Sequence, residues 1–117
     1  MIKFACSRSV KPEEFNEVWC IAHPSRPAPV GAVKVPELAP SNELFEWFTK
    51  QGKNGEWGKT LFDAVFAHQY LNEFGPEGLS KLLELRDLDK AGKHIAVVCT
   101  CPIETICHRS IVAGFLQ

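Results

Sequence analysis

Residues that could do chemistry are concentrated near the end of the chain. Cys99 and Cys101 follow an apolar run, and Cys107, His108 and Arg109 come soon after. A helix that begins near Cys107 would offer amide N–H groups and a partial positive charge, and the imidazole and guanidinium add donors at the same place. We therefore expect the strand-to-helix turn 99–109 to bind an anion such as a phosphate or a carboxylate.

Cys107 is the candidate nucleophile of this turn. Because a helix N-terminus and neighbouring cationic groups stabilise a thiolate, we expect the pKa of Cys107 to be lowered. His108 is the candidate acid and base, Arg109 the candidate anion ligand, and Cys101 a further ligand-binding residue. The competing interpretation is that each cysteine is only a small packing residue.

Two other kinds of cysteine site fit the spacing less well. A phosphatase-like loop needs a cysteine at a fixed separation from its arginine, which here is position 103, and that residue is Ile103. This class is excluded. Sulfur and imidazole suit zinc, but a Cys-x-Cys pair at a strand end and the adjacent Cys107 and His108 are poorly spaced for one ion. No residue is assigned as a metal ligand, and zinc binding stays open only as an alternative.

Two other predicted strands end in residues of similar chemistry. Ser7 and Arg8 follow the first strand, and Arg26 follows the second. In open α/β sheets, ligands settle beyond the carboxyl ends of the strands. We expect Arg8, Arg26 and Arg109 to face one small anionic ligand, with Ser7 beside them.

The pattern of apolar residues predicts an α/β fold. We expect a compact three-layer single domain over residues 1–117, with a small, mainly parallel sheet flanked by helices. Alternating and β-branched runs predict strands at 2–6 and 18–22, and the apolar run His94 to Cys99 predicts a central parallel strand covered on both faces. The proline-rich segment 23–40 is expected to be a loop.

The remaining pattern predicts helices. Ser41 is the expected N-cap of one that ends near Gln51, and Gly75-Pro76 stops a second whose apolar stripe should lie in the core. That stripe consists of Trp57, Leu61, Phe62, Val65, Phe66, Tyr70, Leu71 and Phe74. The third helix carries Leu79, Leu82, Leu83 and Leu88 and ends near Ala91-Gly92, and the last buries Ile111, Val112, Phe115 and Leu116.

Composition narrows the setting of the protein. The net charge of -1 argues against an extensive nucleic-acid surface. Five cysteines and no charged-then-apolar leader argue against a secreted disulfide framework. No apolar run reaches the roughly 18 to 20 residues that cross a bilayer. We expect a cytoplasmic protein that binds no membrane, and a protein partner stays open.

The chain resembles the family named domain of unknown function 488, over roughly residues 18–116. The motifs that carry the resemblance are Leu38-Ala39-Pro40-Ser41 before Glu43-Leu44 and Trp47-Phe48, the aromatic helix around Trp57 and Phe62, and Cys99-x-Cys101 with Cys107-His108-Arg109. The resemblance implies a compact α/β protein in which the Cys-His-Arg motif begins a helix after a buried strand. It points to Cys107, His108, Arg109, Ser41 and, more loosely, Arg26 as site residues, and it implies no substrate.

Three functions fit these residues. The first is an enzyme that acts on a small phosphorylated or nucleotide-like ligand at the turn 99–109. The second is a non-catalytic binding or interaction module, an adaptor or inhibitor that retains a pocket, which the scarcity of general bases near the turn favours. The third is a zinc-binding protein. The sequence identifies no cofactor.

Overall fold

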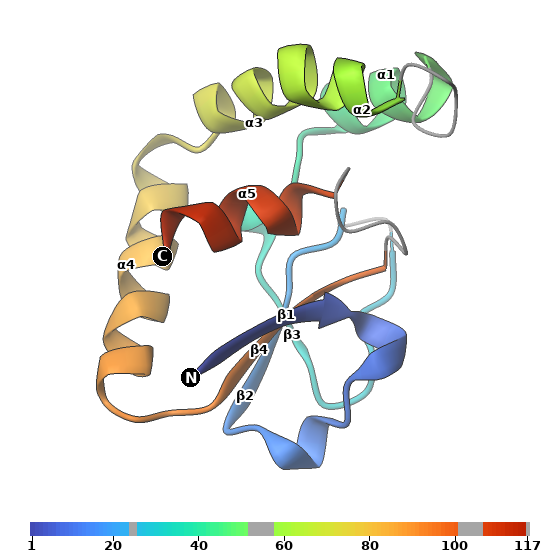
Figure 1. Cartoon of the computed structure of the whole chain (residues 1–117). Coiled ribbons are helices and arrows are strands. Elements are labelled where there is room, and N and C mark those ends of the chain that lie inside the picture. Colours follow the sequence, from blue (N-terminus) through green and yellow to red (C-terminus); the bar gives the residue numbers. More distant parts are fainter. Residues whose placement is uncertain (24–25, 52–57, 101–106, 117) are drawn as a thin grey trace.

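A four-stranded parallel sheet forms the centre of the molecule. The computed structural model describes residues 1–23, 26–51, 58–100 and 107–116 (Figure 1). Within them the strand order is β1-β4-β2-β3. The strands are β1 (Ile2–Cys6), β2 (Glu17–Cys20), β3 (Val33–Lys34) and β4 (Ile95–Cys99). The expected α/β fold, with a small parallel sheet flanked by helices, is confirmed.

Helices pack beside and beyond this sheet. They are α1 (Asn42–Gln51), α2 (Gly58–Leu61), a π-helical stretch (Phe62–Phe66), α3 (Ala67–Glu73), α4 (Gly75–Lys90) and α5 (His108–Phe115). Short 3₁₀ turns occupy Ser7–Ser9, Pro12–Glu14 and Pro36–Leu38. In Figure 1, α5 lies between α3 and the sheet, and it contacts β1 and β4.

The register of the strands brings their carboxyl ends to one edge. Cys6 of β1 lies opposite Cys99 of β4, and Cys20 of β2 lies opposite Val98. The Cys6 sulfur is 4.0 Å from the carbonyl oxygen of Thr100, just past the end of β4. The segments that follow β1, β2 and β4 therefore start from the same edge of the sheet.

Strand β4 is the centre of the core. All five of its residues are buried, as the continuous apolar run predicted. Leu85 of α4 and Val112 of α5 are fully buried with it. The predicted strand at 2–6 is also confirmed, whereas the second strand ends at Cys20 rather than at residue 22.

The segment 23–40 is not wholly loop, which corrects the sequence prediction. It contains β3, a strand of two residues that pairs with β2. The amide of Val35 also donates to the carbonyl of Cys20, at 2.9 Å. Because this strand has only two residues and both are exposed, no alternation of apolar and polar residues marks it in the sequence.

Several apolar side chains that were expected in the core are exposed. Phe62, Phe66 and Tyr70 are buried, but Val65 and Leu71 are exposed. In a π-helical stretch the hydrogen bonds join residue i to i+5, so the chain turns less per residue and an α-helical stripe loses its phase there. The predicted stop of this helical run is confirmed, since α3 ends at Glu73 and Gly75, the first residue of α4, adopts φ +60°.

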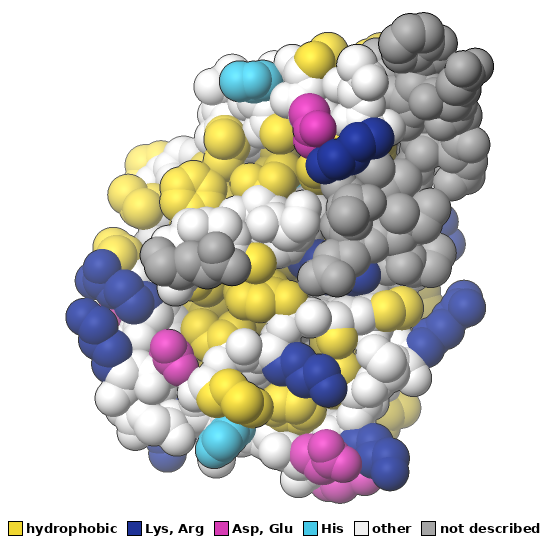
Figure 2. Space-filling model, viewed as in Figure 1, with side chains coloured by type: hydrophobic (Ala, Val, Ile, Leu, Met, Phe, Trp, Pro, Cys, Tyr) yellow, Lys and Arg dark blue, Asp and Glu magenta, His cyan; other side chains and the backbone are white. Residues whose placement is uncertain are grey.

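The same correction applies to the last two helices. Leu79 and Leu83 of α4 and Phe115 of α5 are exposed. In Figure 2, hydrophobic side chains gather over the region where α5 lies beside β1, with Lys and Arg scattered on this face. None of the helices in the described ranges is long and apolar enough to cross a membrane.

Candidate functional site

The start of α5 faces the end of β4 at the carboxyl edge of the sheet. Cys107 is the N-cap of α5, with φ -112° and ψ 140°, and His108 is the first helical residue. The Cys107 carbonyl accepts hydrogen bonds from the Ser110 amide at 3.0 Å and from the Ser110 hydroxyl at 2.8 Å. These bonds fix the backbone where the chain turns into the helix, as the sequence predicted for this position.

The His108 imidazole is held in one orientation. Its Nε2 lies 2.5 Å from the carbonyl oxygen of Ile21, a fully buried residue just beyond β2. Because a carbonyl oxygen only accepts, Nε2 carries the proton, and in the neutral ring Nδ1 carries a lone pair. Nδ1 lies 3.9 Å from the Cys107 sulfur. The side chains of Cys107 and His108 therefore form a thiol and imidazole pair with a defined tautomer.

Cys99 joins this pair. The sulfur atoms of Cys99 and Cys107 and a ring nitrogen of His108 all lie within 4.8 Å of one another, and all three residues are buried. Cys6, Cys20, Cys99 and Cys107 form no disulfide. The end of β4 and the start of α5 thus bring together three side chains that can ligate a soft metal ion.

Tyr70 of α3 packs against the same group. Its ring meets the His108 ring edge-on, with centroids 5.4 Å apart and an interplanar angle of 67°. Its hydroxyl donates to the carbonyl of Leu38 at 2.5 Å. Burial raises the pKa of Tyr70 well above its usual value, and negative charge on Cys107, Cys99 and Glu73 raises it further. Tyr70 is therefore a neutral, fixed wall of the site.

The predicted arginines do not share one environment. Arg109, in the first turn of α5, is 3% exposed, whereas Arg8 and Arg26 are exposed. Ser7 is half-buried and begins the turn after β1. Cys101 lies outside the described residues. That all of these residues contact one ligand remains a prediction.

Ser41 lies where it was expected at the start of α1. Its hydroxyl accepts a hydrogen bond from the Leu44 amide at 3.2 Å, which confirms the predicted N-cap. The hydroxyl and the amide of Ser41 also donate to the Glu73 carboxylate, at 2.7 and 3.1 Å. These bonds tie α1 to the end of α3, and a role of Ser41 in ligand binding stays a prediction.

His23, shortly after β2, is also held in place by its neighbours. His23 is buried, and its Nε2 lies 2.5 Å from the Asn42 side-chain oxygen. Its ring stacks on Phe45 with centroids 4.3 Å apart. His23 follows β2 and therefore links the carboxyl edge of the sheet to α1.

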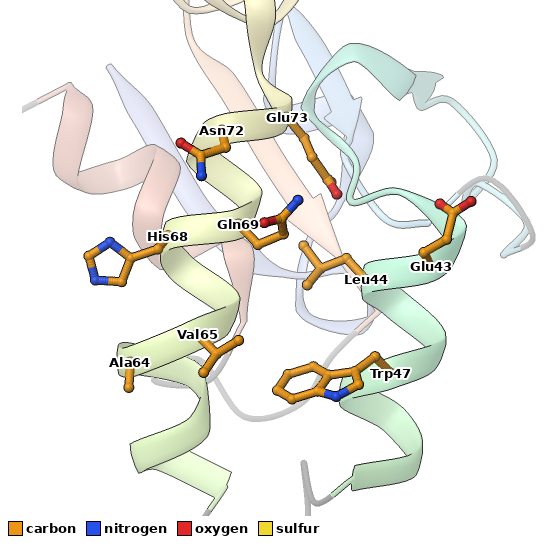
Figure 3. Close-up of a pocket in the computed structure, with 9 residues that line it drawn as sticks. All are labelled: Glu43, Leu44, Trp47, Ala64, Val65, His68, Gln69, Asn72 and Glu73. Atoms are coloured by element: carbon orange, nitrogen blue, oxygen red, sulfur yellow. The ribbon is translucent and has the colours of Figure 1, made fainter.

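A separate groove runs between α1 and the helical run from the π-helical stretch to α3 (Figure 3). Its volume is about 430 Å³, and Trp47, Val65 and His68 are among the residues that line it. Glu43 and Glu73 stand at one end. No described residue of the predicted site lines this groove, so it is distinct from the cluster of Cys99, Cys107 and His108.

Two partners of the cluster were missed from the sequence. Tyr70 lay within an apolar helical stripe, where its position indicated core packing only. The Ile21 carbonyl is a backbone group, which no residue pattern marks. One signal in the sequence could have pointed to Tyr70. It is the one tyrosine of the chain and lies in an otherwise apolar stripe, and a buried tyrosine hydroxyl needs a hydrogen-bond partner.

The family model described as the active DUF488-N3 subclade, DUF488-N3a, matches residues 5–117. No curated protein matches the chain, and no solved structure does. The family match confirms the resemblance that the sequence motifs indicated. The matched range contains the end of β1, the whole of β2, β3 and β4, and the start of α5.

Proposed function

The chain belongs to the active DUF488-N3 subclade, and we propose that it is an enzyme acting on a small phosphorylated or nucleotide-like ligand between β4 and α5. The observation that carries the proposal is the Cys107 and His108 pair, with 3.9 Å between Sγ and Nδ1 and with Nε2 bonded to Ile21. A thiol beside an oriented imidazole is a common way of activating a cysteine nucleophile. The description of the subclade as active supports a catalytic function.

In the proposed reaction the Cys107 proton passes to Nδ1 of His108. The sulfur attacks a phosphorus or carbon atom of the ligand, and a bond to that atom forms as its bond to the leaving group breaks. The leaving group takes the proton from Nδ1, and water then hydrolyses the sulfur adduct. The bond to Ile21 keeps Nε2 protonated, so Nδ1 is the nitrogen that exchanges protons.

The start of α5 would hold the anionic part of the ligand. The Cys107 side chain makes no capping hydrogen bond to the first turn of α5. Amides of that turn and the Arg109 guanidinium favour a phosphate by hydrogen bonding and charge. Ser7 and Arg8 follow β1, and Arg26 lies beyond β2, so they could extend such a site along the same edge.

Thermal unfolding in the presence of nucleotides and sugar phosphates tests the proposal. A ligand at about 100 times its Kd stabilises the fold by about 2.7 kcal/mol, which raises the Tm of a domain of this size by roughly 10 °C. Each stabilising compound is then incubated with the protein and its products are identified. We expect turnover by the wild type and none by Cys107→Ser. A panel without any stabilising compound would overturn the proposal.

The same experiment separates an enzyme from a binding module. A compound that stabilises the wild type and the Cys107→Ser variant equally, and is recovered unchanged from both, would identify non-catalytic binding. A matched control is Cys20→Ala, because Cys20 is also buried but lies on β2 outside the cluster. We expect this control to retain turnover.

A further inference from the structure

We propose that the protein binds a zinc ion through Cys99 Sγ, Cys107 Sγ and His108 Nδ1. Two sulfurs and an imidazole nitrogen are a ligand set that zinc prefers. These atoms come from the end of β4 and the start of α5, and they lie within 4.8 Å of one another in a buried cluster. This proposal does not rest on the proposed enzymatic function, because it concerns metal binding by three side chains alone.

The distances are close to those of a tetrahedral zinc site. Zinc bonds of about 2.3 Å to sulfur and 2.0 to 2.1 Å to nitrogen place neighbouring ligand atoms ~3.6 to 3.8 Å apart. The Cys107 sulfur and His108 Nδ1 are 3.9 Å apart. The widest separation in the cluster, at most 4.8 Å, closes to the zinc distance with a change of about 1 Å in side-chain position.

The orientation of His108 is that of a metal ligand. A histidine that binds a metal through one nitrogen usually donates its other N–H to a carboxylate, a backbone carbonyl or water. Here Nε2 donates to the Ile21 carbonyl, and Nδ1, which lies 3.9 Å from the Cys107 sulfur, is the nitrogen left to bind the ion. The ring therefore needs no change of tautomer to bind zinc through Nδ1.

The charge of the site also fits a divalent ion. A buried charge is costly unless an opposite charge balances it. Cys99 and Cys107 bind zinc as thiolates, and their two negative charges balance the ion while His108 stays neutral. Three protein ligands leave the fourth tetrahedral position for water or another ligand.

Zinc binding and nucleophilic attack by Cys107 exclude each other. A sulfur bonded to zinc no longer offers its thiolate to a substrate, so the metal-free protein is the form in which the reaction proposed above can occur. Cys99 distinguishes the two uses of the site, because it belongs to the metal cluster and has no part in that reaction. Loss of Cys99 should therefore remove zinc binding.

Metal titration of the full chain tests the zinc site. The protein is stripped with a chelator under a reductant that does not bind metal, and is then titrated with zinc and, separately, with cobalt. We expect one tight equivalent, and with cobalt the visible bands of tetrahedral coordination and thiolate-to-cobalt charge transfer. A wild-type protein that binds neither ion would overturn the proposal, and the enzymatic proposal would stand untouched.

Matched variants identify the ligands. Loss of the group that hydrogen-bonds to a metal ligand weakens metal binding by roughly 10- to 100-fold. Cys99→Ala and His108→Gln remove a ligand itself, so each should weaken zinc binding by more than that. Cys20→Ala should bind zinc like the wild type, because Cys20 is equally buried but lies outside the cluster. Near-UV circular dichroism of the metal-free variants checks that each is folded. If Cys99→Ala does not fold, His108→Gln tests the site instead, because its amide can still donate to the Ile21 carbonyl. Zinc affinity unchanged in a folded Cys99→Ala or His108→Gln variant would refute the assignment.

Discussion

Replacing His108 separates its structural role from its chemistry. We predict that His108→Ala lowers the free energy of unfolding by about 3 kcal/mol, whereas His108→Gln lowers it by about 1 kcal/mol. The two variants differ because the glutamine amide can reach the position of Nε2 and donate to the Ile21 carbonyl, as the histidine does at 2.5 Å. Neither variant has a nitrogen lone pair where Nδ1 faces Cys107.

The magnitudes follow from the contacts of the ring. In His108→Ala the fully buried Ile21 carbonyl loses this donor, which costs about 1 to 3 kcal/mol. Both variants also lose the edge-on contact with Tyr70, and such aromatic pairs are worth about 0.5 to 1.5 kcal/mol. The difference of about 2 kcal/mol between the variants is therefore the contribution of the hydrogen bond.

Urea unfolding followed by tryptophan fluorescence measures these free energies in metal-free protein. His68→Ala is the control, because His68 is an exposed helical histidine and such surface changes usually stay within about 0.5 kcal/mol. Equal destabilisation by alanine and glutamine would refute the reasoning, since the ring and not the hydrogen bond would then carry the stability. A loss of less than about 0.5 kcal/mol in His108→Ala would refute it as well.

Three further predictions concern stability. Ser41→Ala should cost about 1 kcal/mol in urea unfolding, because the Leu44 amide loses its cap and Glu73 loses one donor, whereas Ser41→Asn should retain most of it. Tyr70 has a raised pKa in the fold, so its contribution to stability is complete below about pH 10 and is lost as the pH rises further. Tyr70 is the one tyrosine of the chain, so ultraviolet absorbance of tyrosinate reports it alone, and an ionisation midpoint near pH 10 in the folded protein would contradict this. Gly92→Ala should cost about 1 to 2 kcal/mol by calorimetry through its backbone angle alone, because φ is +83° and an added Cβ would meet no atom within 4 Å; an unchanged Tm would refute it.

The sequence predicts the helices and strands that bury either one face or both faces, because burial leaves a regular pattern of apolar residues. Strand β4 is apolar at every position because both of its faces are covered, so a continuous run was sufficient to find it. The start of α5 can be predicted because a polar turn follows the apolar run of β4, and apolar residues at helical spacing follow that turn. Together these two elements predict the place of the site at the carboxyl edge of the sheet.

The rest depends on contacts between distant segments. The exposure of Val65 and Leu71 follows from a π-helical stretch, which the spacing of apolar residues does not reveal. The two-residue strand β3 exists only because β2 offers it hydrogen bonds. Likewise, Tyr70 and the Ile21 carbonyl reach His108 across 38 and 87 positions of sequence, and only the packing of α3 and β2 against α5 brings them together.

The pair of Cys107 and His108 shows why sequence spacing alone does not decide whether two residues can bind one metal ion. Adjacent side chains of an extended strand point to opposite faces, so neighbouring ligands rarely reach one ion. Here Cys107 is extended and His108 is helical, and the backbone bends between them at the N-cap. That bend turns both side chains to the side where β4 ends, which brings Cys99 into the same cluster. Two adjacent residues that could not easily bind one metal ion in a strand are therefore well placed to do so at the start of a helix. The zinc titration of Cys99→Ala measures whether the protein binds zinc through this cluster.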